Sequence, residues 1–168
     1  GVIQDGAKKT SLTKSGAGTL VLGGTNTYTG ATEVSGGTLQ LNQSLTTSSG
    51  LSFTGAGTVD LASGTTLGMN VTTTANGQGT LRLLGSNTVN GNVGDGGNYL
   101  NLTTVGTGDN TINGYVLGNL SFSSAAGNLA LNGGLSDGNA NFFGDNTLTL
   151  KDNESINGTV ASGVDGQG

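Results

Sequence analysis

Residues 12–41 read LTKSGAGTLVLGGTNTYTGATEVSGGTLQL, and this stretch contains the pattern Gly-Thr-Leu-x-Leu twice. The two copies begin at Gly18 and Gly37, so they lie 19 residues apart. In each copy two leucines flank one variable residue, which places both leucines on one face of a β-strand and the variable residue on the other. A strand this short cannot bury a core alone. The pattern therefore predicts equivalent strands that stack on one another at a fixed period.

Near copies of this pattern recur along the rest of the chain. From Leu20 onward the first apolar position returns at steps of 19, 20, 22 and 19 residues, as far as Leu100. The next copy begins at Leu129, 29 residues later, and the last one follows after a further 19. We predict that the apolar pairs form the core columns of the fold: Leu20, Leu22, Leu39, Leu41, Val59, Leu61, Leu81, Leu83, Leu100, Leu102, Leu129, Leu131, Leu148 and Leu150.

The composition favours a β architecture with many tight turns. Glycine occupies 34 of 168 positions, proline is absent, and charged residues make up 9%. Apart from leucine, the commonest residues are poor helix formers, and the Asn-Gly and Gly-Gly pairs suit turns with positive φ. We predict an all-β fold, a right-handed parallel β-helix that forms a solenoid of about 20 residues per coil. It spans residues 1–168 as one segment, and the 29-residue step predicts less regular coils with a loop insertion over residues 103–146.

Two other β architectures also have short strands and frequent turns. An antiparallel meander or sandwich would show them every 8–12 residues, but it needs no repeated side chains at a twenty-residue period. A calcium-binding roll needs an acidic residue at a fixed place in each short repeat, and the acidic residues here keep no such period. The antiparallel arrangement is therefore the main alternative.

The stretch 12–41 closely resembles the passenger-associated repeat of Gram-negative autotransporters. In that family an LTKxGxGTLxLxGxNTYTG segment is followed by a Thr-x-Val turn and another Gly-Thr-Leu. The remaining Asn-Gly-x-Val elements are similar to surface-antigen passengers of alphaproteobacteria, including rickettsial ones. The resemblance implies type V secretion through a C-terminal outer-membrane β-barrel of the same polypeptide, with the passenger displayed at the cell surface or secreted. We expect the barrel and the signal peptide to lie outside this stretch.

The residues offer little for catalysis or cofactor binding. Histidine and cysteine are both absent, which removes the usual base for a Ser or Cys nucleophile and the best zinc ligands. The nearest paired carboxylates are Asp152 and Glu154, beside Lys151, and they read as a solvated turn. We therefore expect no enzymatic activity, no metal and no cofactor, and keep a polysaccharide-processing β-helix enzyme as a distant alternative.

The expected partners lie on other cells. Five scattered basic residues against ten acidic ones argue against nucleic acid, and no apolar run reaches the roughly 20 residues of a membrane helix. The pair Phe142 and Phe143 predicts a contact loop, because adjacent strand residues point to opposite faces and one ring is then exposed. We predict an adhesive, virulence-associated passenger segment that binds a host or neighbouring-cell surface protein or glycan. The alternative is a passive stem or folding-assisting spacer for another effector domain.

Overall fold

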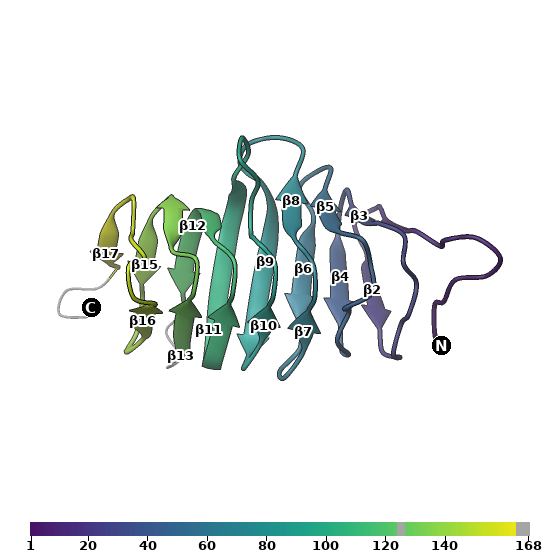
Figure 1. Cartoon of the computed structure of the whole chain (residues 1–168), viewed down its shortest axis with the longest axis horizontal. Helices are drawn as coiled ribbons and strands as arrows, with labels where there is room; N and C mark the ends of the chain where they lie inside the picture. Colours follow the sequence, from purple (N-terminus) through teal and green to yellow (C-terminus); the bar gives the residue numbers. More distant parts are fainter. Residues whose placement is uncertain (124–126, 164–168) are drawn as a thin grey trace.

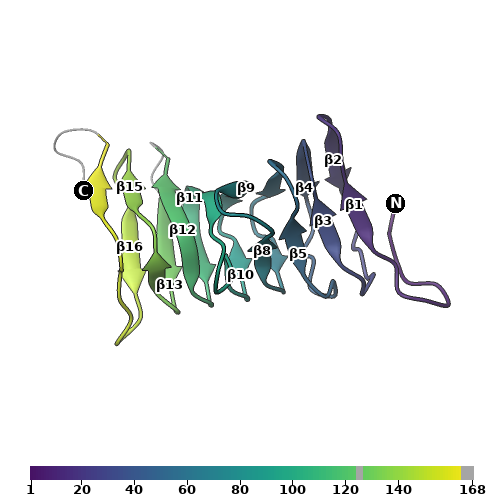
Figure 2. The same cartoon turned by 90° about the horizontal axis from the view of Figure 1, so that it is seen from above.

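The chain forms a rod of stacked strands, seen in a computed structural model that describes residues 1–123 and 127–163, without the side chains of residues 102–104. The N- and C-terminal ends lie at opposite ends of the rod, and the chain advances steadily between them (Figures 1 and 2). Every regular element in the described residues is a β-strand. That part of the chain contains no helix long and apolar enough to cross a bilayer.

Each turn of the chain contributes strands to three faces of the rod. The first face holds β1 (Leu12–Lys14), β3 (Thr32–Val34), β5 (Leu51–Phe53), β8 (Val71–Thr73) and β14 (Leu135–Asp137). The second holds β2 (Thr19–Leu22), β4 (Thr38–Leu41), β6 (Thr58–Leu61), β9 (Gln78–Gly85), β15 (Ala140–Phe142) and β17 (Val160–Ser162). The third holds β7 (Thr66–Leu67), β10 (Thr88–Val89), β13 (Gly127–Leu131) and β16 (Thr147–Leu150). Two longer strands turn a corner: β11 (Leu100–Ile112) runs from the second face to the third, and β12 (Val116–Phe122) from the first to the second.

Every pairing between these strands is parallel and joins one turn to the next. On the first face Leu12 pairs with Thr32, Thr32 with Leu51, and Leu51 with Val71, so the partners are 20, 19 and 20 residues apart. The rod contains about seven such turns. The prediction of an all-β parallel solenoid with a period near twenty residues is confirmed, and the antiparallel alternative is excluded. Right-handed winding stays a prediction.

Two internal columns on the second face follow the predicted series through the first four turns. The register aligns Leu20, Leu39, Val59 and Leu81 in one column, and Leu22, Leu41, Leu61 and Leu83 in the other. All of them are buried except Leu20, which lies on the first turn and is partly covered. Like side chains at the same position in successive turns thus form a continuous apolar interior.

Beyond the fourth turn the predicted core residues no longer all belong to the two columns of the second face. On the second face Leu81 aligns with Thr103 and Leu83 with Val105, and the second column continues through Phe122. Leu100 is buried but aligns with Gln78, and Leu102, whose side chain lies outside the described residues, aligns with Thr80.

The last four predicted core residues lie on the third face. Leu129 and Leu131 belong to β13 and pair with Leu148 and Leu150 of β16. Leu131 and Leu150 extend a third-face column that runs through Leu45, Leu67, Val89 and Ile112, whereas Leu129 and Leu148 follow Asn110. The 29-residue step from Leu100 to Leu129 therefore spans one turn plus a change of face, because Leu-x-Leu marks a half-buried strand wherever that strand lies.

The two ends of the rod are covered differently. At the N-terminal end, residues 1–10 lie along the first turn, where Thr27 N donates to Ile3 O at 2.9 Å and Gly30 N donates to Thr10 O at 2.9 Å. At the C-terminal end, a hollow of about 510 Å³ opens between side chains that include Leu148, Leu150 and Ile156. These residues are only partly buried because no further described turn stacks on them.

Replacing Leu61 by alanine tests the stacked core. Its side chain is fully buried between Leu41 and Leu83 in the turns on either side. We expect Leu61→Ala to lower the free energy of unfolding by about 2–5 kcal/mol, because the cavity cannot close between two fixed turns. The measurement is urea unfolding followed by circular dichroism. The exposed control Leu84→Ala should change it by less than about 0.5 kcal/mol, and equal losses in the two variants would contradict the assigned core.

Candidate functional site

The stretch 12–41 contains a buried lysine that ties two turns of the solenoid together. Lys14 ends β1, and its Nζ donates to the carbonyl oxygens of Ser15 at 2.9 Å, Gly16 at 2.8 Å and Gly36 at 2.9 Å. All three ammonium donors are therefore used. Gly37, which follows in the next turn, has a φ of 63°, and a Cβ there would overlap the oxygens of Gly16 and Gly18. The glycines of the motif thus let the backbones of the two turns lie close together, and the Lys14 ammonium group bonds to both of them.

A second internal network surrounds Tyr28, whose side chain is completely buried. Its hydroxyl lies 2.7 Å from Thr32 Oγ1, which lies 3.0 Å from Ser48 Oγ in the following turn. Ser48 in turn donates to Gly30 O at 2.9 Å. Burial raises the pKa of the Tyr28 hydroxyl, and the hydrogen bond to Thr32 opposes that shift. The hydroxyls of this network satisfy polar groups that would otherwise be buried without partners.

The same stretch also holds the N-terminal residues against the rod. Asn26 Oδ1 accepts a hydrogen bond from Ile3 N at 2.8 Å, and Asn26 Nδ2 donates to Gly24 O at 2.7 Å. Asp5 accepts from Thr29 Oγ1 at 2.6 Å, from Thr29 N at 3.0 Å and from Thr10 N at 2.8 Å. The hydrogen bond from the Thr29 hydroxyl, followed by the one from Thr10 N, lowers the pKa of the Asp5 carboxyl.

These contacts involve the residues that the comparison with known families singles out. Residues 12–41 match the family described as Passenger-associated-transport-repeat, which is a feature of autotransporter passengers. The chain thus carries a passenger repeat within a β-solenoid, as segments of autotransporter passengers do. No curated protein and no solved structure matches it.

The passenger repeat bears on how such proteins are exported and where in the cell envelope they are found. An autotransporter passenger is associated with a C-terminal β-barrel translocator and is displayed at the surface or secreted. The resemblance to autotransporter passengers is thereby confirmed. The finer likeness to alphaproteobacterial surface antigens stays a prediction.

The two adjacent phenylalanines of the passenger segment occupy different environments. Phe142 ends β15 with 6% of its side chain exposed, and its ring stacks on Phe122 with centroids 4.4 Å apart and planes 8° apart. Phe143 follows on the outside of the rod with 45% of its side chain exposed. Its ring lies over Gly163 of the next turn, where a Cβ would overlap it. One of the pair thus packs in the core and the other faces solvent.

The acidic residues considered for catalysis lie apart from any enclosed site. Asp152 and Glu154 are both exposed on the turn that follows β16, together with Lys151. The turn is closed by a hydrogen bond from Glu154 N to Lys151 O at 3.0 Å, and Asn153 adopts a φ of 69° within it. Among the described residues no group of three metal-ligating side chains comes together. This arrangement is typical of a solvated turn.

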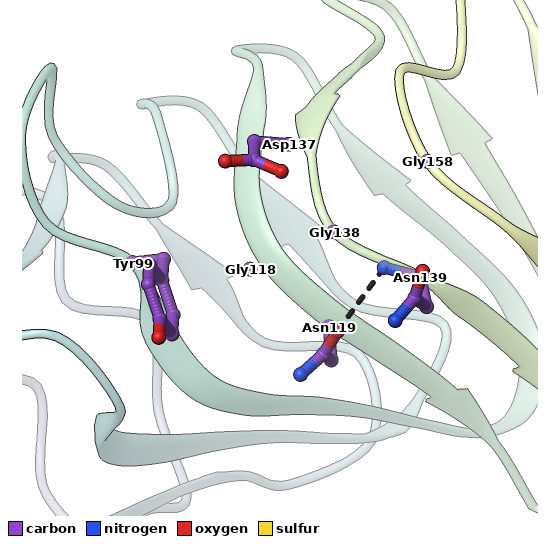
Figure 3. Close-up of a pocket in the computed structure, with 7 residues that line it drawn as sticks. All are labelled: Tyr99, Gly118, Asn119, Asp137, Gly138, Asn139 and Gly158. Carbon is purple, nitrogen blue, oxygen red and sulfur yellow. Dashed lines mark hydrogen bonds between the residues drawn. The ribbon is translucent and has the colours of Figure 1, made fainter.

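A shallow groove lies where the first and second faces meet, and no residue of it was singled out from the sequence. It has a volume of about 320 Å³ and is lined by Tyr99, Gly118, Asn119, Asp137, Gly138, Asn139 and Gly158 (Figure 3). A pattern was present in the sequence, since Gly118-Asn119, Gly138-Asn139 and Gly158-Thr159 follow one another at a step of 20. This repeat points to a groove only when the structure shows that the three pairs lie at the same corner of successive turns.

Removing the buried charge of the repeat tests its structural role. We expect Lys14→Met to weaken the junction of the first two turns by about 2–3 kcal/mol, because three carbonyl oxygens lose a charged donor. Amide hydrogen exchange in β1 to β4 measures the local opening. The exposed Lys9→Met serves as the matched control. Equal protection of these strands in both variants would show that the lysine does not hold the junction.

The low pKa of Asp5 predicts a local loss of structure in acid. Because the carboxyl titrates lower in the folded state, its contribution is fully present above the unfolded pKa of about 3.9 and is lost as pH falls through the folded pKa. We therefore expect the attachment of residues 1–10 to weaken progressively as the pH falls below about 4, while the rest of the rod persists. The hydrogen-exchange rates of the Thr10 and Thr29 amides, measured as a function of pH, report this local opening. Asp5→Asn should remove the pH dependence, and an unchanged profile in that variant would refute the assignment.

Proposed function

We propose that this passenger segment is a surface-displayed rod that contacts host or neighbouring cells and acts in adhesion and virulence. The observation that carries the proposal is a passenger repeat built into a continuous solenoid, in which each turn is stacked on the next. Such a rod presents its outward side chains in fixed rows, as solenoid proteins do when they bind other proteins along one side. The receptor on the other cell is a protein or a glycan.

The outward side chains of the second face support a role in contact with an aqueous surface. Between the core columns, the outward position is occupied by Val21, Gln40, Asp60 and Arg82 in successive turns. Arg82 Nε donates to Asp60 Oδ1 at 2.6 Å, so the charged pair spans two turns. The hydrogen bond to Asp60 raises the pKa of Arg82. Asp60 is covered and only 7% exposed, whereas Val21 is 49% exposed, so the outward row is only partly open to solvent.

An exposed aromatic side chain offers one candidate anchor for a partner. Phe143 stands on the outside of the rod, next to the stacked pair Phe122 and Phe142 that fixes the backbone beneath it. Aromatic residues are enriched among the side chains that contribute most to protein interfaces, and a rigid support lowers the entropy lost on binding. We therefore place a contact loop at Phe142 and Phe143.

A passive stem is the second candidate function, and one observation favours it. The large apolar side chains exposed in the described residues are scattered along the rod rather than gathered in one patch: Val2, Val21, Leu84, Tyr99, Phe143 and Val160. Protein interaction sites usually form contiguous apolar patches. A stem that lifts another effector domain from the membrane would need no such patch.

Cell binding by the purified segment tests the proposal. We expect the wild-type chain to bind host or bacterial cells above background, and Phe143→Ala to weaken binding by about tenfold or more, since aromatic anchors contribute about 2 kcal/mol. Leu84→Ala is the control, because this side chain is also apolar and exposed. Flow cytometry with the labelled protein gives the affinity. Absence of binding to every cell type would favour the stem, and equal binding by both variants would remove Phe143 from the contact.

A further inference from the structure

The floor of the groove at the junction of the first and second faces is bare backbone. Gly118, Gly138 and Gly158 occupy equivalent corners in three successive turns. A Cβ on Gly138 would overlap Gly118 O, and a Cβ on Gly158 would overlap Gly138 O. No larger residue fits at these two corners without moving the turns apart. The corner therefore carries a recess with a fixed floor, open to solvent along one side.

One wall of the groove presents amide donors in a fixed orientation. Asn119 Oδ1 accepts a hydrogen bond from Asn139 N at 3.1 Å, and Asn139 Oδ1 accepts one from Thr159 N at 3.1 Å. The oxygen of each amide is thus engaged by the next turn. Figure 3 shows the bond between Asn119 and Asn139. Each Nδ2 is then directed away from that bond, and neither finds an acceptor among the described residues. Two N–H donor groups are available to a ligand without any rearrangement.

The opposite wall and the rim supply an aromatic ring and a carboxylate. Tyr99 stands across the groove from Asn119 with 39% of its side chain exposed, while Asp137 lies at the rim above Gly118 (Figure 3). The backbone of Tyr99 is held by Asn76 Oδ1, which accepts from its N at 3.1 Å, and by Gly77 N, which donates to its O at 3.0 Å. The ring is therefore carried on a fixed backbone. Asp137 is exposed and has no basic side chain paired with it in the described residues.

We propose that this groove binds a neutral saccharide. A pyranose ring has an apolar C–H face that packs on an aromatic ring, and hydroxyl groups around its edge that both donate and accept hydrogen bonds. Tyr99 matches the apolar face, Asp137 accepts from hydroxyls, and the Asn119 and Asn139 amides donate to hydroxyl oxygens. The volume of about 320 Å³ lies at the lower end of the range of ligand sites, about 300–1,000 Å³, and suits a short saccharide.

The charges of the groove exclude the other common ligand classes. Asp137 would repel a phosphate or a sugar carboxylate, and no lysine or arginine lines the groove to compensate. A metal ion would find only one carboxylate there. A hydrophobic peptide side chain would cover the amide donors without accepting their hydrogen bonds. A neutral polyol satisfies all of these groups together.

The inference rests on the proposed surface display, since a saccharide on another cell must reach the groove, and it names the chemical class of the partner. Saturation-transfer NMR with the whole segment tests it directly. The neutral probes are lactose, maltotriose and cellotriose at millimolar concentration, and sialyllactose is the anionic comparison. We expect saturation transfer to at least one neutral probe and a weaker effect with sialyllactose than with lactose.

Two exposed substitutions locate the site. Tyr99→Ala should lower the affinity at least tenfold by removing the stacking surface, and Asp137→Asn should lower it severalfold while keeping the shape of the side chain. The matched controls are Leu84→Ala and Asp145→Asn, which change an exposed apolar and an exposed acidic residue outside the groove. Both should bind as the wild type does. Unchanged thermal unfolding of all four variants shows that none has lost the fold.

Cell binding measured in parallel separates this inference from the proposed function. Saccharide binding that Tyr99→Ala abolishes supports the saccharide site in the groove, whether or not the segment binds cells. If no cell is bound, only the proposed adhesion is contradicted. Cell binding without a signal from any neutral probe overturns the groove and leaves adhesion standing. Saccharide binding that persists in both groove variants, or a preference for sialyllactose, also overturns it.

Discussion

Each turn of this solenoid is stabilised almost entirely by its two neighbours, because strands that are mostly five residues or shorter cannot bury an apolar side chain alone. Parallel backbone hydrogen bonds hold successive turns in register, and that register places leucine above leucine along the inside of the rod. The spacing between turns is then fixed near 4.8 Å. Glycine corners, buried amides and the bridging lysine all follow from this spacing, since each lets two backbones lie close together.

The passenger repeat illustrates how polar residues serve the same stacking. Lys14 bridges a glycine turn to the next one, and Tyr28 connects through Thr32 to Ser48. Asn87 and Asn110 also connect two turns, at the third face, where Asn87 N donates to Asn110 Oδ1 at 3.0 Å. The repeat that matches the passenger family is thus a set of contacts between turns. A groove such as the one beside Tyr99 lies where a glycine corner repeats in successive turns.

The sequence predicts the architecture well because its period is explicit. The step from Leu20 to Leu39 to Val59 marks one column directly, and the register agrees. It cannot assign a face, because Leu-x-Leu has the same alternation on each of them, which is why Leu129 belongs to the third. The sequence also does not reveal that Lys14 is buried, because lysine is rarely buried unless its ammonium is fully paired, and the pairing carbonyl groups come from the backbone. The sequence does not reveal the groove for a related reason. Tyr99 and Asn119 are brought to the same groove only by the register of the stacked turns, which the sequence alone does not give.

Disulfide cross-linking between neighbouring turns tests the in-register parallel stacking most directly, and the chain contains no cysteine of its own. Val21 and Gln40 are paired across the first two turns of the second face, whereas Asp60 lies one turn further on. Oxidation of the double variant Val21→Cys with Gln40→Cys should give an intramolecular disulfide, since strand neighbours lie within the Cα separation of about 4.4–6.8 Å that a disulfide spans. The double variant Val21→Cys with Asp60→Cys should not form one. Equal cross-linking of both pairs, or of neither, would contradict the stacked register.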